Sequence, residues 1–115
     1  MPTARRGLRL VELNGKVWAI GGYDTTHTDK VEIYDPVSDS WETGTSLSMI
    51  RYSPALWVSA GRVFAGGGSN QSGTMHASIE LFNPHTNQWN IIGDLPQPTR
   101  RAASVVLDGK VYVIA

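Results

Sequence analysis

Short apolar runs rich in β-branched and aromatic residues are separated by polar turn residues along the whole chain. No segment keeps an apolar stripe at intervals of three and four residues over three helical turns, so the pattern offers no alternative to strands. We therefore predict an all-β chain. The expected strands are 8–13, 16–21, 30–35, 40–43, 54–59, 62–66, 77–83, 88–91, 102–107 and 110–114.

The same arrangement of residues recurs along the chain. Gly15-Lys16-Val17-Trp18-Ala19-Ile20-Gly21-Gly22 aligns with 61–68 and 109–115, at offsets of 46 (15 to 61) and 48 (61 to 109). A second block, Val31-Glu32-Ile33-Tyr34-Asp35-Pro36, aligns with 79–84 at an offset of 48 (31 to 79). Four short strands joined by tight turns and repeated at this period are typical of β-propeller blades. We predict units at roughly 1–46, 47–94 and, incomplete, 95–115.

Turn residues stand at equivalent places in the units. Asp35-Pro36 and Asn83-Pro84 are expected to form hairpin corners, because proline presets φ and the preceding side chain can bond the backbone. Gly21-Gly22 and Gly67-Gly68 are expected where strands end, and they imply a sharp exit or a close approach of another segment. Neither pair opens a helix or fits a phosphate-binding motif.

Two tryptophans also recur. Trp41 and Trp89 follow Tyr34 and Phe82 by seven residues, so each unit places two large aromatic side chains on adjacent strands. We expect these rings to fill the space of about 10 Å between stacked sheets. A stacking site for a sugar or a base is the functional alternative, but recurrence in each unit favours the structural role.

Together, the glycine pairs, the segment Glu32-Ile33-Tyr34-Asp35-Pro36 and the spaced Trp41 resemble the Kelch repeat over essentially the whole chain. The resemblance implies a partial β-propeller of four-stranded antiparallel blades, with two full repeats and half of a third. Propellers close with about four to eight blades, so we expect the remaining blades outside this sequence. The second unit departs from the pattern at Phe82 and Asn83, and the third has Ala115 in place of glycine.

The resemblance also implies where a ligand binds. In Kelch-like propellers the exposed loops of one face lie just before the first strand of each blade and just after the glycine pair. Arginines there suit acidic peptides, because guanidinium binds carboxylates in a fork geometry. The alternative is that each arginine pairs with a turn carbonyl or an acidic neighbour. Carried over position by position, the ligand-binding residues are Arg6, Tyr23, Asp24, Arg51, Tyr52, Ser69, Asn70 and Arg100.

The spacing between these arginines and the hairpin glycines differs by one residue among the units. Arg6 and Arg100 precede their hairpin glycine by nine positions, whereas Arg51 precedes its glycine by ten. We expect a module that binds a protein or a peptide, such as an adaptor, as part of a larger Kelch-repeat protein. The net charge is zero, and no stretch approaches a membrane span, so neither nucleic acid nor membrane is expected as a partner.

The chemistry-bearing residues give little support to catalysis. Without cysteine there is no Tyr-Cys cross-link of the kind that a copper-radical sugar oxidase needs, and His27, His76 and His85 show no ligand spacing. His27 with Asp24 and Asp29 is interpreted as a solvated turn rather than a cation site. We expect no enzyme, no cofactor and no metal. The alternative is part of a Kelch-type sugar oxidase or epimerase whose catalytic groups lie outside this segment.

Overall fold

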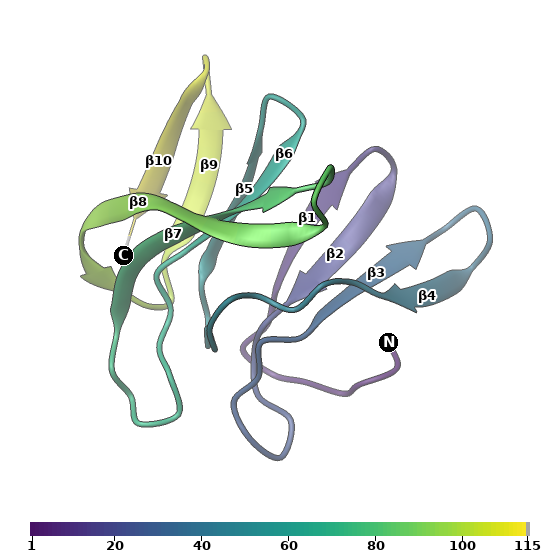
Figure 1. Cartoon of the computed structure of the whole chain (residues 1–115), viewed down its shortest axis with the longest axis horizontal. Helices are drawn as coiled ribbons and strands as arrows, with labels where there is room; N and C mark the ends of the chain where they lie inside the picture. The colour runs from purple at the N-terminus through teal and green to yellow at the C-terminus, as the bar shows by residue number, and fades with distance from the viewer. Residues whose placement is uncertain (115) are drawn as a thin grey trace.

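Residues 1–114 form two four-stranded antiparallel sheets and one hairpin (Figure 1). The structure is a computed structural model; Ala115, the last residue of the third repeat, lies outside the described residues. Strands that are neighbours in the sequence are neighbours in each sheet. The first sheet contains β1 (Arg9–Leu13), β2 (Lys16–Ile20), β3 (Val31–Asp35) and β4 (Ser40–Thr43). The second sheet contains β5 (Ala55–Ser59), β6 (Arg62–Gly66), β7 (His76–Asn83) and β8 (Gln88–Thr99), and the C-terminal hairpin contains β9 (Ala103–Leu107) and β10 (Lys110–Ile114).

All ten expected strands are present, so the all-β prediction is confirmed, and their ends differ from expectation by at most one residue except in β8. We expected β8 to end at residue 91, but it continues to Thr99 through Pro96 and Pro98. It is the edge strand of its sheet, where a missing backbone N–H does not interrupt a ladder on both sides. Its pairing with β7 is also irregular at two places. Among residues 1–114, no helix is long and apolar enough to cross a membrane.

The corners form as the turn residues predict. Asp35 Oδ1 accepts a hydrogen bond from the Val37 backbone N–H at 2.9 Å, and Asn83 Oδ1 accepts one from His85 N–H at the same distance. These side chains replace backbone partners that a tight turn leaves free. The antiparallel meander of each sheet is therefore encoded locally.

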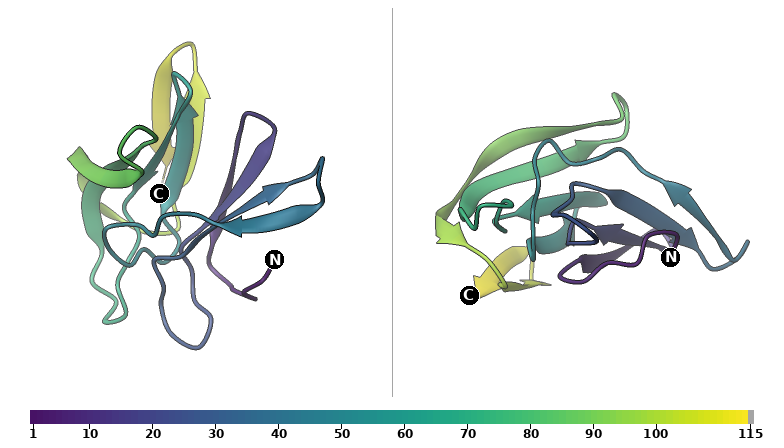
Figure 2. Two further views of the ribbon diagram at one scale, coloured as in Figure 1. Left: turned by 45° about the vertical axis from the view of Figure 1, so that its right-hand side comes forward. Right: turned by 90° about the horizontal axis from the view of Figure 1, so that it is seen from below.

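The two sheets pack face to face, with their first strands side by side. β1 contacts β5 and β5 contacts β9, and the sheets diverge from there towards β4 and β8 (Figure 2). A hydrophobic core fills the space between the first and second sheets. Its members from the first sheet and its linker are Trp18, Ile20, Val31, Ile33 and Leu47; those from the second are Leu56, Val63, Ala65 and Trp89.

The recurring tryptophans occupy equivalent strand positions but differ in burial. Trp89 is 6% exposed, lies edge-on to Trp18 at 6.5 Å, and donates its indole N–H to Thr45 O at 2.9 Å. Trp41 pairs across the sheet with Tyr34, as Trp89 does with Phe82, but it is only partly buried. The first sheet has no neighbour on that side among residues 1–114. The predicted packing role is thus realised for Trp89 only.

The glycine pairs lie where the backbone of the next unit passes. Gly22 has a φ of 102° and donates its N–H to Arg51 O at 3.2 Å, and a Cβ there would stand 2.7 Å from Arg6 O. In the second sheet, Gly68 donates to Thr99 O at 2.7 Å. The predicted close approach is confirmed, and it explains why a side chain is excluded.

Candidate functional site

The long connections gather at one end of the sheets, which we call the loop face. It carries the β2–β3 loop (21–30), the β6–β7 loop (67–75) and the linkers that lead into β1, β5 and β9, at the lower end of Figure 1. The opposite end carries the short hairpin turns. All eight residues predicted to bind a ligand lie in the loops and linkers of the loop face.

Two pairs of predicted residues are joined by backbone bridges. Arg6 and Tyr23 exchange both backbone hydrogen bonds, at 3.0 and 2.8 Å, and Tyr52 and Ser69 do the same at 2.8 and 3.1 Å. In both sheets, therefore, the residue three positions before the first strand lies beside the residue that follows the glycine pair. This also aligns Arg6 with Tyr52, which settles the register between the units.

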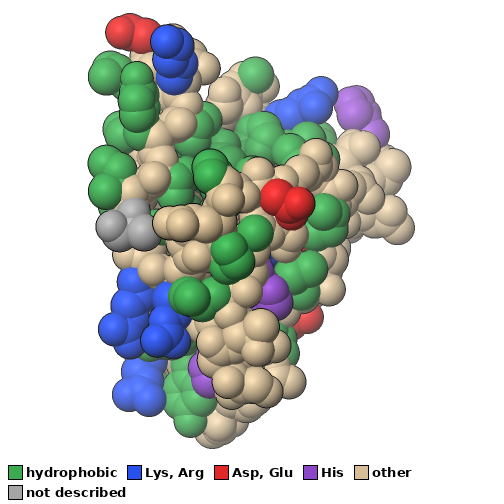
Figure 3. All heavy atoms as spheres, turned by 90° about the vertical axis from the view of Figure 1, so that its left-hand side faces the viewer, with side chains coloured by type: hydrophobic (Ala, Val, Ile, Leu, Met, Phe, Trp, Pro, Cys, Tyr) green, Lys and Arg blue, Asp and Glu red, His purple; other side chains and the backbone are tan. Residues whose placement is uncertain are grey.

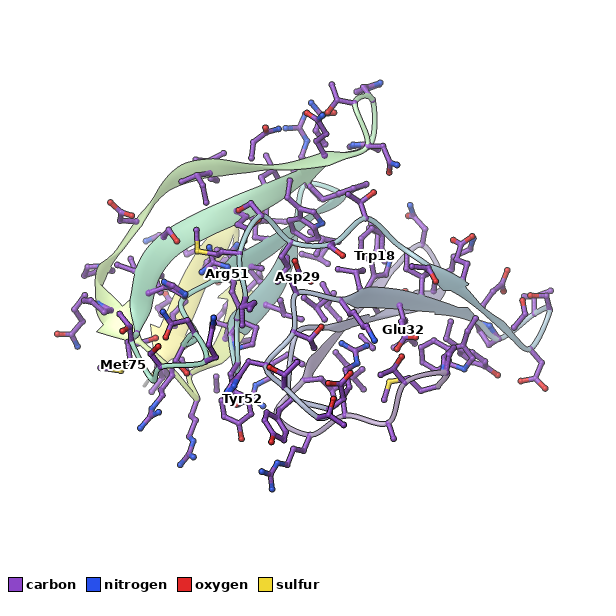
Figure 4. All side chains as sticks on the ribbon, turned by 60° about the horizontal axis from the view of Figure 1, so that its bottom comes forward. Trp18, Asp29, Glu32, Arg51, Tyr52 and Met75 are labelled. Atoms are coloured by element: carbon purple, nitrogen blue, oxygen red, sulfur yellow. The ribbon has the colours of Figure 1, made fainter. Side chains whose placement is uncertain are left out.

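An aromatic cluster joins the loops of the two sheets. The guanidinium of Arg6 lies 4.9 Å from the centre of the Tyr23 ring, and the His27 ring stands edge-on to Tyr23 at 5.0 Å and to Tyr52 at 5.3 Å. Figure 4 shows Tyr52 at the edge of the loop face. His27 was not predicted to bind a ligand. No signal in the sequence places it here, because its contact with Tyr52 crosses between units.

Arg51 does not have the exposed position that we expected of it. Its side chain is fully buried, its Nε donates to Glu80 Oε2 at 2.8 Å, and it also donates to Gly67 O and Ser78 O at 2.6 and 2.9 Å (Figure 4). The alternative interpretation, an arginine paired with an acidic neighbour and turn carbonyls, therefore applies to Arg51. Ser69 is likewise buried, with 1% of its surface exposed.

Arg5, not Arg6, is the counterpart of Arg51. Both stand ten residues before a hairpin glycine, and Arg5 NH2 pairs with Glu32 Oε1 at 2.9 Å while NH1 donates to Lys30 O at 3.2 Å. Each arginine thus ties the two ends of a long loop to the following strand. The sequence contained a signal for this pair, since the glutamate recurs in the repeated block, but we did not connect it with Arg5.

The third unit has no such arginine, because Thr99 stands at the equivalent position. Arg100 and Arg101, the next two residues, are exposed on the loop face. Figure 3 shows basic side chains gathered near the lower edge, on the side of the long loops. Neither Arg6, Arg100 nor Arg101 forms an ion pair with any residue that the structure describes. These three cations lie on one face of a chain whose formal net charge is zero.

Asp24 and Asn70 shape the loops that carry them. The backbone N–H of Thr26 donates to Asp24 Oδ1 at 3.1 Å, and this bond, together with Thr25 and Lys30, holds the pKa of Asp24 below its ordinary value. Asn70 Oδ1 accepts hydrogen bonds from the N–H groups of Ser72 and Thr74, at 2.9 and 3.0 Å. Both side chains are partly exposed.

His76 begins β7 behind the second loop. Its Nε2 lies 3.2 Å from Ile50 O, and burial together with the nearby charge of Arg51 lowers the pKa of its imidazole. Within 1–114 there is no group of three or more histidine, aspartate or glutamate side chains arranged to hold a metal ion. The guanidinium, phenol and imidazole groups at the loop face can form hydrogen bonds, ion pairs and ring contacts.

Comparison with known proteins agrees with these features. The family model of the Kelch motif matches residues 4–48. The chain is 31% identical to Kelch-like protein 35 of Mus musculus over 92% of its length, and 34% identical to Kelch-like ECH-associated protein 1A of Danio rerio over 98%. It spans 19% and 18% of the length of these two relatives.

A solved structure agrees as well. The structure of YjhT superimposes with a TM-score of 0.86 over 96% of this chain and 43% of that one, at 19% sequence identity. At this identity the likeness establishes the fold, a partial β-propeller of four-stranded antiparallel blades. With the motif match, the relatives and the repeated sheets in agreement, the chain belongs to the Kelch-repeat family.

Proposed function

We propose that this chain is a protein- or peptide-binding module of a larger Kelch-repeat protein and that its loop face binds an acidic segment of the partner. The relatives support the first part, because they are Kelch-like proteins and one is named for its association with a partner, ECH. The exposed arginines of the loop face support the second part. Guanidinium groups form strong charge-assisted hydrogen bonds with carboxylates.

The observation that carries the proposal is the cluster of Arg6, Tyr23, His27 and Tyr52. It brings a cation, two phenol hydroxyls and an imidazole together from two units. Tyrosine supplies a rigid contact surface and a hydrogen-bonding group at small entropic cost. We assign the partner contacts to this cluster and to Arg100.

The remaining predicted residues are assigned to support. Arg51 and Ser69 are buried and hold the loops and linkers in place. Asp24 and Asn70 fix the conformation of the loops through their backbone hydrogen bonds. Since their side chains are partly exposed, they remain available at the rim of the surface.

The test uses a fluorescein-labelled peptide of eight glutamates as the probe, with an eight-serine peptide for comparison. We expect salt-sensitive binding of the acidic peptide, weakened about tenfold by Arg6→Ala or Arg100→Ala through loss of charge-assisted hydrogen bonds. Arg62→Ala is the matched control, because Arg62 is exposed beside a hairpin turn at the opposite end. Equal binding by all three variants would refute the assignment of the loop face. If neutral sugars, rather than the acidic peptide, protect the amides of the loop face from hydrogen exchange, the result would favour the sugar-enzyme alternative.

A further inference from the structure

A cavity opens in the wedge between the first and second sheets. It has a volume of about 440 Å³, within the range of small-ligand sites, and lies where the sheets diverge towards β4 and β8 (Figure 2). One wall comes from β2, β3, β4 and the linker after β4, and the other from β7 and the β7–β8 corner. Both sheets have four strands, so complete blades bound the cavity on its two sides. None of the residues predicted to bind a ligand lines it.

The first wall contains a row of three side chains across the first sheet. Trp18 and Glu42 both pair with Ile33, from the strands on its two sides, so the three share one face of the sheet. Trp18 and Ile33 belong to the inter-sheet core, and this places Glu42 on the side that faces the second sheet. The row runs from the buried Trp18 to the exposed Glu42. The cavity therefore has an apolar inner end and a carboxylate at its mouth.

The second sheet supplies the opposite wall. Phe82 stands edge-on to Trp18 with ring centres 5.4 Å apart, and Pro84 lines the cavity from the β7–β8 corner. These rings offer a surface for a hydrocarbon chain or for a flat cation. Thr45, in the linker after β4, adds a hydrogen-bond acceptor. Its carbonyl oxygen accepts the indole N–H of Trp89 at 2.9 Å with one lone pair, and a carbonyl oxygen has two.

The charge of the wedge is negative. Among residues 1–114, Glu42 is the only charged residue that lines the cavity, and its carboxylate forms no ion pair within this range. Lys16 and Asp35, which line an adjoining cavity of about 70 Å³ together with Glu42, carry opposite charges. In the second unit Asn90 occupies the position of Glu42, so the repeat itself does not require an acid there.

We propose that this wedge binds an arginine side chain of a partner polypeptide, with the guanidinium paired to Glu42 and the apolar stem packed on Phe82 and Pro84. The negative charge of the wedge favours a cationic occupant. Arginine is favoured over lysine because a guanidinium is flat and weakly hydrated, stacks on aromatic rings, and presents several N–H donors to the carboxylate and carbonyl acceptors. The wedge thus prefers a charge opposite to that of the acidic segment assigned to the loop face.

The test compares blocked glycine peptides that carry arginine, citrulline or lysine at the central position. Citrulline has nearly the shape of arginine but no charge, and the blocked ends remove the terminal charges. Binding is followed by the nuclear magnetic resonance shifts of the Trp18 indole N–H and of the backbone amides of residues 43–45. We expect saturable shifts with the arginine peptide and about fivefold weaker binding of the citrulline peptide. The lysine peptide should bind with an affinity between the two.

Two variants of the chain separate the charge of Glu42 from the charge of the sheet as a whole. Glu42→Gln keeps the shape of the side chain and removes its charge, so it should abolish the preference for arginine over citrulline. Glu12→Gln is the matched control. Glu12 is also an exposed glutamate of the first sheet, but it pairs with Val17, on the face opposite to that of Trp18. This variant should keep the preference.

The comparison of the peptides on the unaltered chain decides the proposal even where a variant fails to fold. Equal affinities of the arginine and citrulline peptides, no saturable shift with either, or shifts confined to the loop face would overturn it. Stronger shifts of the same amides by a neutral sugar would also overturn the preference for a cation. Failure of the acidic peptide at the loop face would leave this result unaffected, since the two sites share no residue.

Discussion

Replacement of Trp89 by alanine tests whether the inter-sheet core is the main source of stability. Trp89 is 6% exposed and contacts Trp18 and Phe82 from the two sides of the interface. Burial of an indole removes roughly 150–250 Å² from water, which corresponds to about 4–6 kcal/mol gross at ~25 cal/mol per Å². Alanine keeps part of that burial but leaves a cavity, so the expected loss is about 3–5 kcal/mol of unfolding free energy.

The hydrogen bond from Trp89 to Thr45 contributes to that figure. Its loss leaves the Thr45 carbonyl without this donor and costs about 1 kcal/mol. Trp89→Phe therefore separates the two contributions, because it keeps a ring in the core and removes only the donor and part of the area. We expect a loss of about 1–2 kcal/mol for this milder change.

The measurement is urea unfolding followed by far-ultraviolet circular dichroism, with Trp41→Ala as the control. Trp41 occupies the equivalent strand position but is only partly buried, and its ring contact is with Tyr34 at 5.1 Å. We expect Trp41→Ala to cost about 1 kcal/mol in this chain, the value of an aromatic pair. In a ring with a preceding sheet, Trp41 should behave as Trp89 does here and cost about 3–5 kcal/mol. Equal losses for Trp41→Ala and Trp89→Ala in this chain would refute the reasoning from sheet-on-sheet burial.

Three further predictions concern the supporting network. Arg51→Met should lower the free energy of unfolding in urea by about 3–5 kcal/mol, because the Glu80 carboxylate stays buried without its cation. Adding Glu80→Leu should recover part of this loss. An unchanged unfolding midpoint for the single variant would contradict a buried ion pair. Gly22→Ala should destabilise the chain more than Gly61→Ala. Both glycines have positive φ, but of these two only Gly22 would bring a Cβ against backbone atoms. Thermal melts that rank the two variants the other way would contradict the close approach at Gly22. His76 has a lowered pKa in the folded state, so the unfolded chain binds more protons just below the ordinary value of 6.5, and stability falls as the pH drops through that window. The dependence between pH 7.5 and 5 should be weaker in His76→Gln, and identical profiles would contradict a lowered pKa for this partly buried imidazole.

The strands and corners were predictable because their signals are local. A run such as Val31–Asp35 favours a strand whatever lies beside it, and Asp35 makes its turn bond two residues along the chain. The close approach at the glycine pairs was also predictable, since recurrence of glycine at equivalent positions indicated that the backbone there excludes a side chain. The extension of β8 to Thr99 was not, because prolines oppose a strand on average and only the edge position permits them.

The candidate site was predictable only in part. The repeat predicts that the long loops lie at one end, and it identified Arg6, Tyr23 and Tyr52 as neighbours of the glycine pairs. The repeat did not distinguish the exposed Arg6 from the arginines with buried side chains, Arg5 and Arg51. That distinction depends on Glu32 and Glu80, which lie 27 and 29 residues along the chain from their partners.

The sequence by itself determined the all-β architecture, the repeat and the positions of the turns, because strand period and turn chemistry act over a few residues. The tertiary structure decided which equivalent residues are alike in environment. Trp41 and Trp89 have the same local sequence context but different burial, since among residues 1–114 only Trp89 faces another sheet. Burial and charge pairing depend on what lies across an interface, and neighbours across an interface are far apart along the chain.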